Sequence, residues 1–425
     1  MAAARTNSYK YYVLAVLSAV TVLNYYDRSV VSIILQPMKK DLGLTDTQAG
    51  LLSGMAFAVV YSLCGLPIAR IADRGFRVKV LSAALTFWSL MTVACGFAGN
   101  AVALFFARMG VGAGEAGGFP TTQAIVAEYF SPEKRAKALS TIAIASSLGV
   151  ISGLTVGGFV SDHLGWRAAF WVGGVPGLLL AALVLSTIRE PGAWLWGGDP
   201  DAQAPPRVGV FTAIKQLWRR SAYFLFVAGM TVAMIAAYAL DTWTPTFLIR
   251  SYGLKASEVG LLTGMVSAVP SIIGMAAGGF LNEWWSKRDK RAPVWIVAIS
   301  FTVAAPLGIA TFLAPNLYLA VSAILVSSLV GAANIGSSYT LVQGLAGPKL
   351  RATAAAIYMA VVNLIALSTG PAVAGLLSDL LAPTAGNDSL RWSLCIISVV
   401  YIGSLPFLFL ASRTVEADMA AAERT

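Results

Sequence analysis

Long apolar segments follow one another along most of this 425-residue chain and restrict what it can fold into. A helix needs about 20 apolar residues to cross a bilayer. Hydrophobic residues make up 57% of the chain and charged residues only 12%, against roughly 25% charged residues in soluble domains. The pattern predicts an all-α integral membrane protein and excludes a disordered chain or a soluble enzyme. Its twelve predicted transmembrane segments are 11–37, 48–70, 79–98, 101–127, 137–161, 167–188, 220–248, 257–281, 292–313, 316–343, 351–380 and 391–411.

One long polar interruption, at 189–219, divides these segments into two sets of six. We therefore expect an N-terminal six-helix bundle at 11–188 and a C-terminal one at 220–411, with tails at 1–10 and 412–425. On the side of the membrane that holds both tails and the linker, the loops and tails carry 22 of the 30 Lys and Arg residues, against six on the other side. The positive-inside rule then places both termini in the cytoplasm. The short tails indicate a multi-pass protein of the bacterial inner (plasma) membrane.

The two halves carry an internal repeat. The sequence Gly-Leu-Leu-Ser-Gly-Met at 50–55 recurs as Gly-Leu-Leu-Thr-Gly-Met at 260–265, and Pro-x-x-Arg-Ala at 132–136 recurs at 348–352. Because the corresponding loops of both halves are basic, both copies have the same orientation in the membrane. This predicts a parallel repeat of two pseudo-symmetric six-helix bundles. Two similar bundles that rock against each other provide alternating access.

Four charged residues interrupt the apolar segments of the first half: Asp27, Arg28, Arg108 and Glu115. Each costs about 2.5–3.5 kcal/mol at the membrane centre on insertion scales, so they must pair, face water or be neutral. Arg108 and Glu115 are seven residues apart and share a helix face. By depth Asp27 lies between them, so it can reach both if the first and fourth helices are neighbours. The arrangement predicts a proton-coupling cluster; the alternative is a static set of salt bridges.

Other polar residues occupy comparable positions. Asp241 lies 214 residues after Asp27, near its repeat equivalent, and is expected to line a cavity or cap an interface, while Asn334 and Asn363 could face a substrate cavity or bond across helices. Gly149, Gly153 and Gly157 form a small-residue stripe that predicts close helix packing. The three cysteines lie in apolar segments and the single histidine in a loop, so we expect no metal site and no disulfide.

These features resemble the major facilitator superfamily of transporters. The loop sequence Asp73-Arg74-Gly75-x-Arg77-x-Lys79 is similar to the superfamily's cytoplasmic gating motif, and Arg108-x-x-x-Gly112 is similar to its fourth-helix motif, which is tied to proton transfer. The resemblance implies the major facilitator fold. The residues that it assigns to the cytoplasmic gate are Asp73, Arg74, Arg77, Arg135, Glu283 and Arg351.

Within that superfamily the chain resembles spinster-type lipid transporters. The residues that carry the resemblance are Asn24-Tyr25-Tyr26-Asp27-Arg28, Gly112-x-Gly114-Glu115-Ala116, Gly165-Trp166-Arg167 and Arg189-Glu190-Pro191. It implies that Asp27 and Glu115 carry protons with Arg28 and Arg108 as partners, and that Asn24 and Tyr25 line the substrate cavity. Eukaryotic spinster proteins export lysophospholipids or sphingosine phosphate. Proton symporters of sugar acids share Asn-Tyr-x-Asp-Arg and Gly-x-x-Glu-Ala-x-x-Phe-Pro, which Phe119-Pro120 completes here.

The sequence therefore predicts a secondary active transporter that works by alternating access, coupled to protons through Asp27 and Glu115. The expected substrate is a small amphiphilic or anionic molecule, of the lysophospholipid or sphingoid type; the alternative is an organic anion such as a sugar acid. We expect no cofactor, since a proton gradient supplies the energy, and a functional monomer. The expected partners are the lipid bilayer, the substrate and protons, with no nucleic acid, because the net charge of +10 follows from the basic loops.

Other classes of protein fit less well. A primary pump needs a nucleotide site, and the chain has no Gly-x-x-x-x-Gly-Lys motif. A membrane enzyme needs nucleophile, base or metal ligands near the interface, which one loop histidine and three apolar-embedded cysteines do not supply. A receptor or scaffold needs neither buried acid–arginine clusters nor a six-helix repeat.

Overall fold

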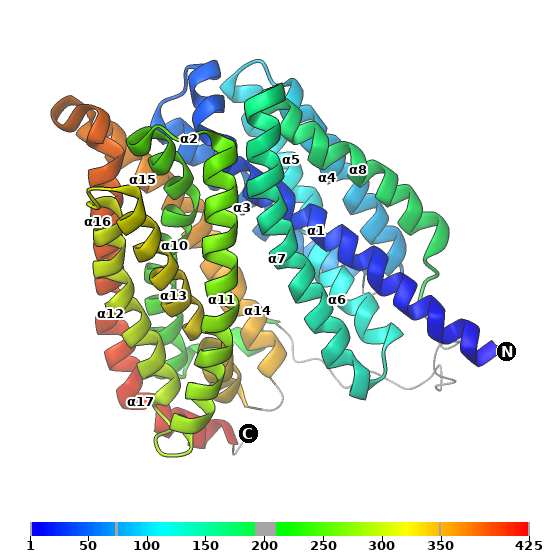
Figure 1. The fold of residues 1–425 in the computed structure, drawn as a ribbon. Coiled ribbons are helices and arrows are strands. Elements are labelled where there is room, and N and C mark those ends of the chain that lie inside the picture. The colour runs from blue at the N-terminus through cyan, green and yellow to red at the C-terminus, as the bar shows by residue number, and fades with distance from the viewer. Residues whose placement is uncertain (1, 73–74, 192–209, 348–349, 424–425) are drawn as a thin grey trace. The chain divides into compact units, whose positions relative to one another are not determined.

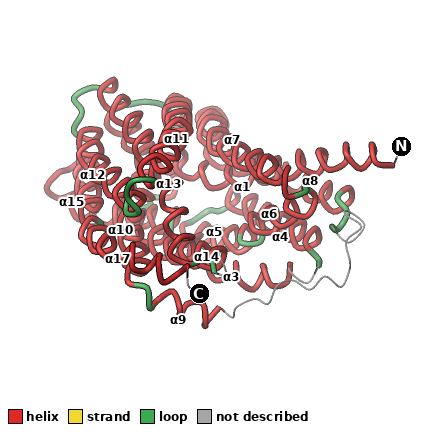
Figure 2. Tube along the Cα trace, turned by 90° about the horizontal axis from the view of Figure 1, so that it is seen from below, coloured by secondary structure: helices red, strands yellow, loops and turns green. Residues whose placement is uncertain are grey.

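The computed structural model describes residues 2–72, 75–191, 210–347 and 350–423, and within these ranges it consists of helices joined by short loops, with no strand (Figures 1 and 2). The chain divides into two compact units: Met1–Gln203 with Gly253–Gly264, and Ala204–Tyr252 with Met265–Thr425. The first half contains α1 Ala2–Leu42, α2 Asp46–Ser53, α3 Met55–Ala72, α4 Arg77–Phe97, α5 Ala101–Glu115, α6 Gly118–Tyr129, α7 Pro132–Leu164 and α8 Trp166–Thr187. The second contains α9 Val210–Trp218, α10 Ser221–Tyr252, α11 Ala256–Ser286, α12 Ala292–Phe312, α13 Leu317–Ala346, α14 Arg351–Val362, the π-helix η2 Asn363–Leu367, α15 Ser368–Ala385, the 3₁₀ turn η3 Gly386–Asp388, α16 Ser389–Gly403 and α17 Leu405–Glu423.

Each of the twelve apolar segments predicted from the sequence falls on one helix or on a run of consecutive helices. Four of them are interrupted: by Gly54 between α2 and α3, by Ala116 and Gly117 between α5 and α6, by η2 between α14 and α15, and by Ser404 between α16 and α17. Within the described ranges nine stretches are long and apolar enough to cross a membrane, one of which runs over the successive helices from Thr353 to Ala422. The predicted all-helical membrane fold is confirmed.

The helices extend beyond the apolar segments at both ends of the chain. α1 begins at Ala2, and α17 continues to Glu423. The Ala-rich ends contain no Pro or Gly, so nothing ends the helix where the apolar segment does. The helix α9 forms in the polar linker, where no helix is predicted from the sequence. Its Ile214, Leu217 and Trp218 have the spacing of one helix face, and Leu217 is fully buried.

The same helix pairs form in both units. In the first unit α1 packs on α7, and α4 packs on α8 and α5 (Figure 1). In the second unit α10 packs on α15, and α12 packs on α16 and α13. Each half has six transmembrane segments, and the pairing is the same in both halves. The first segment packs on the fifth, and the third segment packs on the sixth and the fourth. The packing thus agrees with the repeat seen in the sequence.

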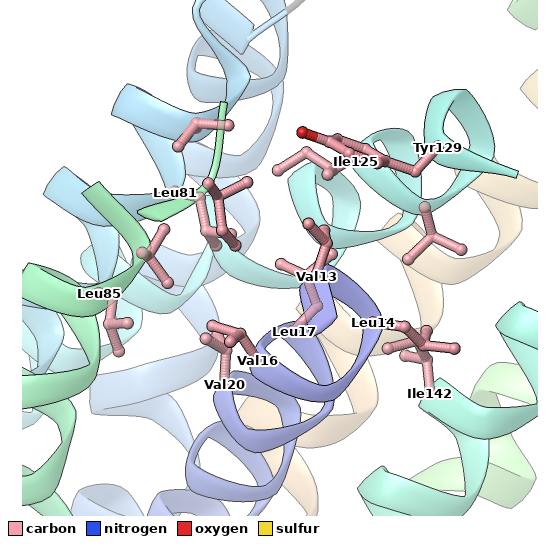
Figure 3. Close-up of a cluster of buried hydrophobic side chains, with 14 of the residues drawn as sticks. Val13, Leu14, Val16, Leu17, Val20, Leu81, Leu85, Ile125, Tyr129 and Ile142 are labelled. Atoms are coloured by element: carbon pink, nitrogen blue, oxygen red, sulfur yellow. The ribbon is translucent and has the colours of Figure 1, made fainter. Parts of the chain in front are cut away.

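The core at one end of the first unit joins α1 to four other helices, α4, α6, α7 and α8. Val13, Leu17 and Val20 of α1 are at most 1% exposed and point toward Leu81 and Leu85 of α4 (Figure 3). The same cluster includes fully buried side chains of α6 and α7, such as Ile125, Tyr129 and Ile142. Apolar packing on several sides thus fixes the position of α1, the helix that carries Asp27 and Arg28.

The glycine stripe of α7 lets that helix approach α1 very closely. A Cβ atom on Gly149 would lie 2.6 Å from the carbonyl oxygen of Val22, and one on Gly153 would lie 2.8 Å from that of Tyr26. Both distances are below van der Waals contact, so only glycine fits. This confirms the predicted role of the stripe, since close backbone contact is how small residues hold membrane helices together.

The Gly165-Trp166-Arg167 sequence ties the start of α8 to the end of α1. Gly165 has φ +86°, a conformation that side chains disfavour. Arg167 Nη1 and Trp166 Nε1 both donate to Asp41 Oδ2, at 2.6 and 3.3 Å. Hydrogen bonds from Arg167, then from Trp166, lower the pKa of Asp41. This part of the spinster-like pattern therefore has a structural role.

The Arg189-Glu190-Pro191 sequence has a comparable role at the other end of the unit. Glu190 Oε1 accepts hydrogen bonds from the backbone N–H groups of Val78 and Lys79, at 3.0 and 3.1 Å. These groups belong to the first turn of α4 and have no partner inside the helix. The carboxylate at this helix N-terminus is also favoured by the helix dipole. The end of α8 is thus tied to the start of α4.

We predict that Gly149→Ala lowers the unfolding temperature of the purified protein, because the added Cβ would overlap the α1 backbone, at about 1–3 kcal/mol for an overpacked site. The matched control is Gly279→Ala, at a helical glycine of α11 where a Cβ would meet nothing within 4 Å. There the ordinary gain of alanine over glycine in a helix applies. Thermal unfolding in detergent measures both; equal behaviour of the two variants would contradict the close contact of α1 with α7.

Candidate functional site

The four charged residues of the first-half apolar segments gather in one cluster inside the first unit. α1 supplies Asp27 and Arg28, and α5 supplies Arg108 and Glu115. Asp27, Arg108 and Glu115 are 1%, 3% and 0% exposed. Charges this deeply buried are found where they pair with one another or serve a function.

Arg28 and Glu115 form an ion pair within a ring of aromatic side chains. Arg28 Nε donates to Glu115 Oε2 at 2.7 Å. The Arg28 guanidinium lies 5.5, 5.0 and 4.7 Å from the ring centroids of Tyr25, Phe57 and Tyr61. These ring faces favour a cation. Arg28 Nη2 and Glu115 Oε1 are buried without a hydrogen-bond partner among the described residues, so each half of the pair keeps one polar atom for another ligand or a proton.

Asp27 has a different set of neighbours from Arg28, although the two are adjacent in the sequence. Its Oδ2 accepts a hydrogen bond from Thr92 Oγ1 on α4 at 3.1 Å. Its Oδ1 is buried and has no hydrogen-bond partner in the described part of the chain. A Cβ atom on Gly173 of α8 would lie only 2.5 Å from that oxygen. The carboxyl group of Asp27 fits against α8 only because that helix carries a glycine at position 173.

Arg108 influences both carboxyl groups without forming an ion pair with either. It acts electrostatically on both Asp27 and Glu115, but within the described ranges it has no carboxylate oxygen at 4.0 Å or less. Its guanidinium carbon lies 5.4 Å from the Phe57 ring centroid, and its Nε and Nη1 are buried with no hydrogen-bond partner in the part of the chain that the structure describes. A buried guanidinium without a partner is strongly unfavourable. Such a group can bind an incoming anion or take over a carboxylate released by its present partner.

The pairing differs in detail from the arrangement expected from depth alone. By depth Asp27 could reach both Arg108 and Glu115, whereas the residue of α1 that reaches Glu115 is Arg28. Successive residues of a helix point about 100° apart, because a turn has about 3.6 residues. Asp27 is therefore directed to α4 and α8, and Arg28 to α3 and α5.

The remaining predicted cavity residues have varied surroundings. Asn24 is buried beside Glu115, and both its amide atoms lack hydrogen-bond partners in the described ranges. Asn334 donates to the carbonyl of Gly331 in its own helix at 2.6 Å, and Asn363 accepts from Tyr238 Oη at 2.8 Å. Asn363 also begins η2, and a π-turn inside a helix is frequently found at functional sites. Asp241 is exposed and makes no hydrogen bond or ion pair within the described residues.

The residues assigned to the cytoplasmic gate lie on several elements. Arg77 pairs with Glu128 at 2.5 Å, and Glu283 pairs with Lys287 at 3.0 Å on the surface of α11. Arg135 has a buried Nε without a partner among the described residues, and Arg351 is exposed. Asp73 and Arg74 lie outside the described residues. The gate assignment therefore stays a prediction.

Several residues of the cluster were not foreseen. Thr92 and Gly173 hold and accommodate Asp27, while Phe57 and Tyr61 enclose Arg28. Only Thr92 has a usable signal, because it is the last of four hydroxyl residues that recur every three or four positions in the segment 79–98. In the part of the chain that the structure describes, no group of three or more His, Cys, Asp or Glu residues could hold a metal ion.

A two-part helical membrane fold with a buried acid–arginine cluster defines a membrane transporter. The chain belongs to the Major Facilitator Superfamily, whose family model matches residues 17–371. Its resemblance to spinster-type proteins is confirmed by the crystal structure of a bacterial homolog to the human lysosomal transporter Spinster, in an inward-facing and unoccupied conformation. That structure has a TM-score of 0.87 and 30% sequence identity over 96% of this chain and 98% of its own.

Two further relatives have different descriptions. An MFS-type efflux pump of Mycolicibacterium smegmatis is 33% identical over 94% of this chain and 92% of its own length. The probable galactarate/D-glucarate transporter GudP of Escherichia coli is 28% identical over 67% of this chain and 68% of its own length. The chain is therefore a secondary transporter of the multi-pass membrane type and not an enzyme.

We predict that Thr92→Val reduces transport about tenfold or more, because a hydrogen bond to a charged group contributes about 1.5–3 kcal/mol. Thr92→Ser keeps the hydroxyl and should restore transport. Thr86→Val is the control on the same helix, since the hydrogen bond of Thr86 among the described residues goes to the carbonyl of Ser82. Substrate uptake by proteoliposomes measures all three; wild-type transport by Thr92→Val would show that this hydrogen bond does not support the function.

Proposed function

We propose that this chain is a proton-coupled transporter of an amphiphilic anion, with Asp27 and Glu115 as the proton carriers and Arg28 and Arg108 as their exchangeable partners. The observation that carries the proposal is the incomplete pairing of the cluster. Two carboxyl groups and two guanidinium groups share one buried space, yet only the contact between Arg28 and Glu115 is an ion pair. A static set of salt bridges would leave neither Arg108 nor Asp27 Oδ1 without a partner.

The coupling follows from the charge balance of the cluster. With both carboxyls ionised, the two acids and the two arginines sum to zero. Protonation of Glu115 removes the charge that holds Arg28 and leaves the cluster with a positive excess. An anionic substrate then replaces the lost carboxylate charge, and its departure favours release of the proton. A substrate shifts the balance of conformations only through different affinities for them, and the rearranged arginine contacts supply that difference.

The aromatic side chains around Arg28 support the proposal of an amphiphilic substrate. An anionic group at the Arg28 guanidinium would lie among the faces of Tyr25, Phe57 and Tyr61. These rings suit an apolar group attached to the anion better than the hydroxyl groups of a sugar acid. The similarity to the Spinster homolog agrees with a lysophospholipid-type substrate. The second candidate, a sugar acid, is supported by the similarity to the galactarate/D-glucarate transporter.

The wider architecture completes the proposal. We infer that both termini are cytoplasmic, because the loops on their side hold 22 of the 30 basic residues. Asn24 and Tyr25 of the first unit, and Asp241, Asn334 and Asn363 of the second, are proposed to line the substrate path. The six gate residues named above would then act on the cytoplasmic side. The bundles at 11–188 and 220–411 would provide the two moving parts.

The first test replaces each acid by its amide. We predict that Glu115→Gln and Asp27→Asn each abolish transport driven by a pH gradient while the protein still folds, because the amides cannot exchange protons. The measurement is uptake into proteoliposomes under an imposed pH gradient, with one labelled lysophospholipid and one labelled sugar acid. Asp388→Asn is the matched control, since Asp388 forms a surface pair with Arg391 at 3.1 Å.

The outcomes separate the alternatives. Gradient-driven movement of the lysophospholipid that is lost in both amide variants supports the proposal. Movement of the sugar acid instead keeps the coupling residues and replaces the substrate. Loss of folding on either amide substitution, with no effect of Asp388→Asn, would favour a static salt-bridge cluster. Unchanged gradient-driven transport in both variants would contradict proton coupling through these acids.

A second test concerns Arg28 and the three aromatic side chains around it. We predict that Arg28→Lys weakens the apparent affinity for the anionic substrate about tenfold, because lysine loses the planar stacking and the fork of donors of arginine. Arg167→Lys is the matched control: Arg167 also pairs with an acid and lies 4.3 Å from a ring centroid, but at the surface. Concentration dependence of uptake measures both. Equal affinities for Arg28→Lys and wild type would remove Arg28 from the substrate site.

A further inference from the structure

A second charged feature lies at one end of the second unit. The turn that joins α11 to α12 meets α17 there (Figure 1), with Arg291 Nε and Nη2 donating to Glu416 at 3.1 and 3.4 Å. Between these elements is an open basin of about 660 Å³. It is lined by Arg288, Asp289, Lys290, Arg291 and Glu416.

The acidic groups of this basin already have partners. Glu416 pairs with Arg291, and Asp289 Oδ1 accepts a hydrogen bond from the backbone N–H of Arg291 at 2.8 Å. Arg288 and Lys290 are exposed, and within the described ranges neither has a carboxylate within ion-pair distance. The basin therefore presents two uncompensated cations, which favours an anionic ligand.

Aromatic rings support these cations at the edge of the basin. The Arg288 guanidinium lies 4.3 Å from the Trp284 ring centroid, one turn earlier on α11. On α17, Arg413 lies 4.6 Å from Phe409, whose ring contacts Trp295 of α12 at 6.4 Å. Arg413 precedes Glu416 by three residues and so shares its helix face. Two arginines, one just after α11 and one on α17, thus lie over aromatic rings.

A collar of exposed apolar side chains continues from the basin along the helices. Trp284 and Phe280, four residues apart on α11, are 54% and 75% exposed, and Phe409 on α17 is 47% exposed. Tryptophan at this position is typical of the membrane–water interface. A soluble anion would use only the cations, whereas a lipid would use both the cations and the collar.

We propose that this basin, defined by Arg288, Lys290 and Arg291 with Trp284 and Phe409 at its rim, binds the headgroup of an anionic membrane phospholipid. Its phosphate lies at Arg288 and Lys290, and its acyl chains follow Phe280 and Trp284. Basic pockets beside transmembrane helices commonly bind anionic headgroups. The site is independent of the buried cluster and of the substrate, so it stands or fails separately from the proposed function.

The test is native mass spectrometry of the full chain in detergent, with phosphatidylglycerol or phosphatidylcholine of the same acyl chains. We expect the wild type to bind phosphatidylglycerol more tightly. The double variant Arg288→Gln/Lys290→Gln should lose about 30-fold in that affinity, the factor that two headgroup contacts of ~1 kcal/mol each give. It should bind phosphatidylcholine as the wild type does and unfold at the same temperature, since both side chains are exposed.

The matched control is Lys134→Gln/Lys137→Gln, which removes two exposed charges at the start of α7. The proposal is supported if this control keeps the wild-type affinity for phosphatidylglycerol. It is overturned if the control loses as much affinity as the basin variant, because bulk charge then explains the binding. Equal wild-type binding of the two lipids overturns it too, as does displacement of the lipid by soluble glycerol 3-phosphate at equal concentration.

Discussion

The cost of charge inside a membrane is the constraint on which the first unit depends. Asp27, Arg108 and Glu115 are almost completely buried, and one ion pair with Arg28 at 2.7 Å satisfies only part of the set. Full pairing would give a stable but fixed cluster. The incomplete pairing leaves a guanidinium and carboxyl oxygens that another ligand can satisfy. A buried polar network that is only partly satisfied is expensive, and that expense is consistent with a site that changes partners.

Close helix packing maintains this arrangement. Gly149 and Gly153 bring α7 against α1, and Gly173 of α8 leaves room for the carboxyl of Asp27. The apolar core around Val13 and Leu17 fixes α1 further along the helix (Figure 3). Asp27 and Arg28 therefore keep separate neighbours. A rotation of α1 about its axis would change both sets of contacts together, which gives a physical route from protonation to helix movement.

Much of the fold could be predicted from the sequence, and less of the site. The apolar segments, the repeat and the α7 glycines each have a pattern of fixed spacing, and the structure agrees with them. The depths of the four charged residues in the membrane were enough to predict that they form one cluster. Depth alone does not show whether Arg28 or Asp27 is the partner of Glu115, because the choice depends on how α1 is rotated about its axis. Gly173, Phe57 and Tyr61 contact the cluster from helices that are distant from it in the sequence. Residue spacing within a single sequence does not reveal such contacts.

The central claim is that proton movement and substrate movement are coupled through the buried cluster. The most direct measurement is proton flux into proteoliposomes, followed by a trapped pH-sensitive dye, when only a gradient of lysophospholipid or sugar acid is imposed. The account predicts proton movement that follows the transported substrate in the wild type and is absent in the double amide variant of Asp27 and Glu115. Substrate that equilibrates in the wild type with no accompanying proton flux would contradict it.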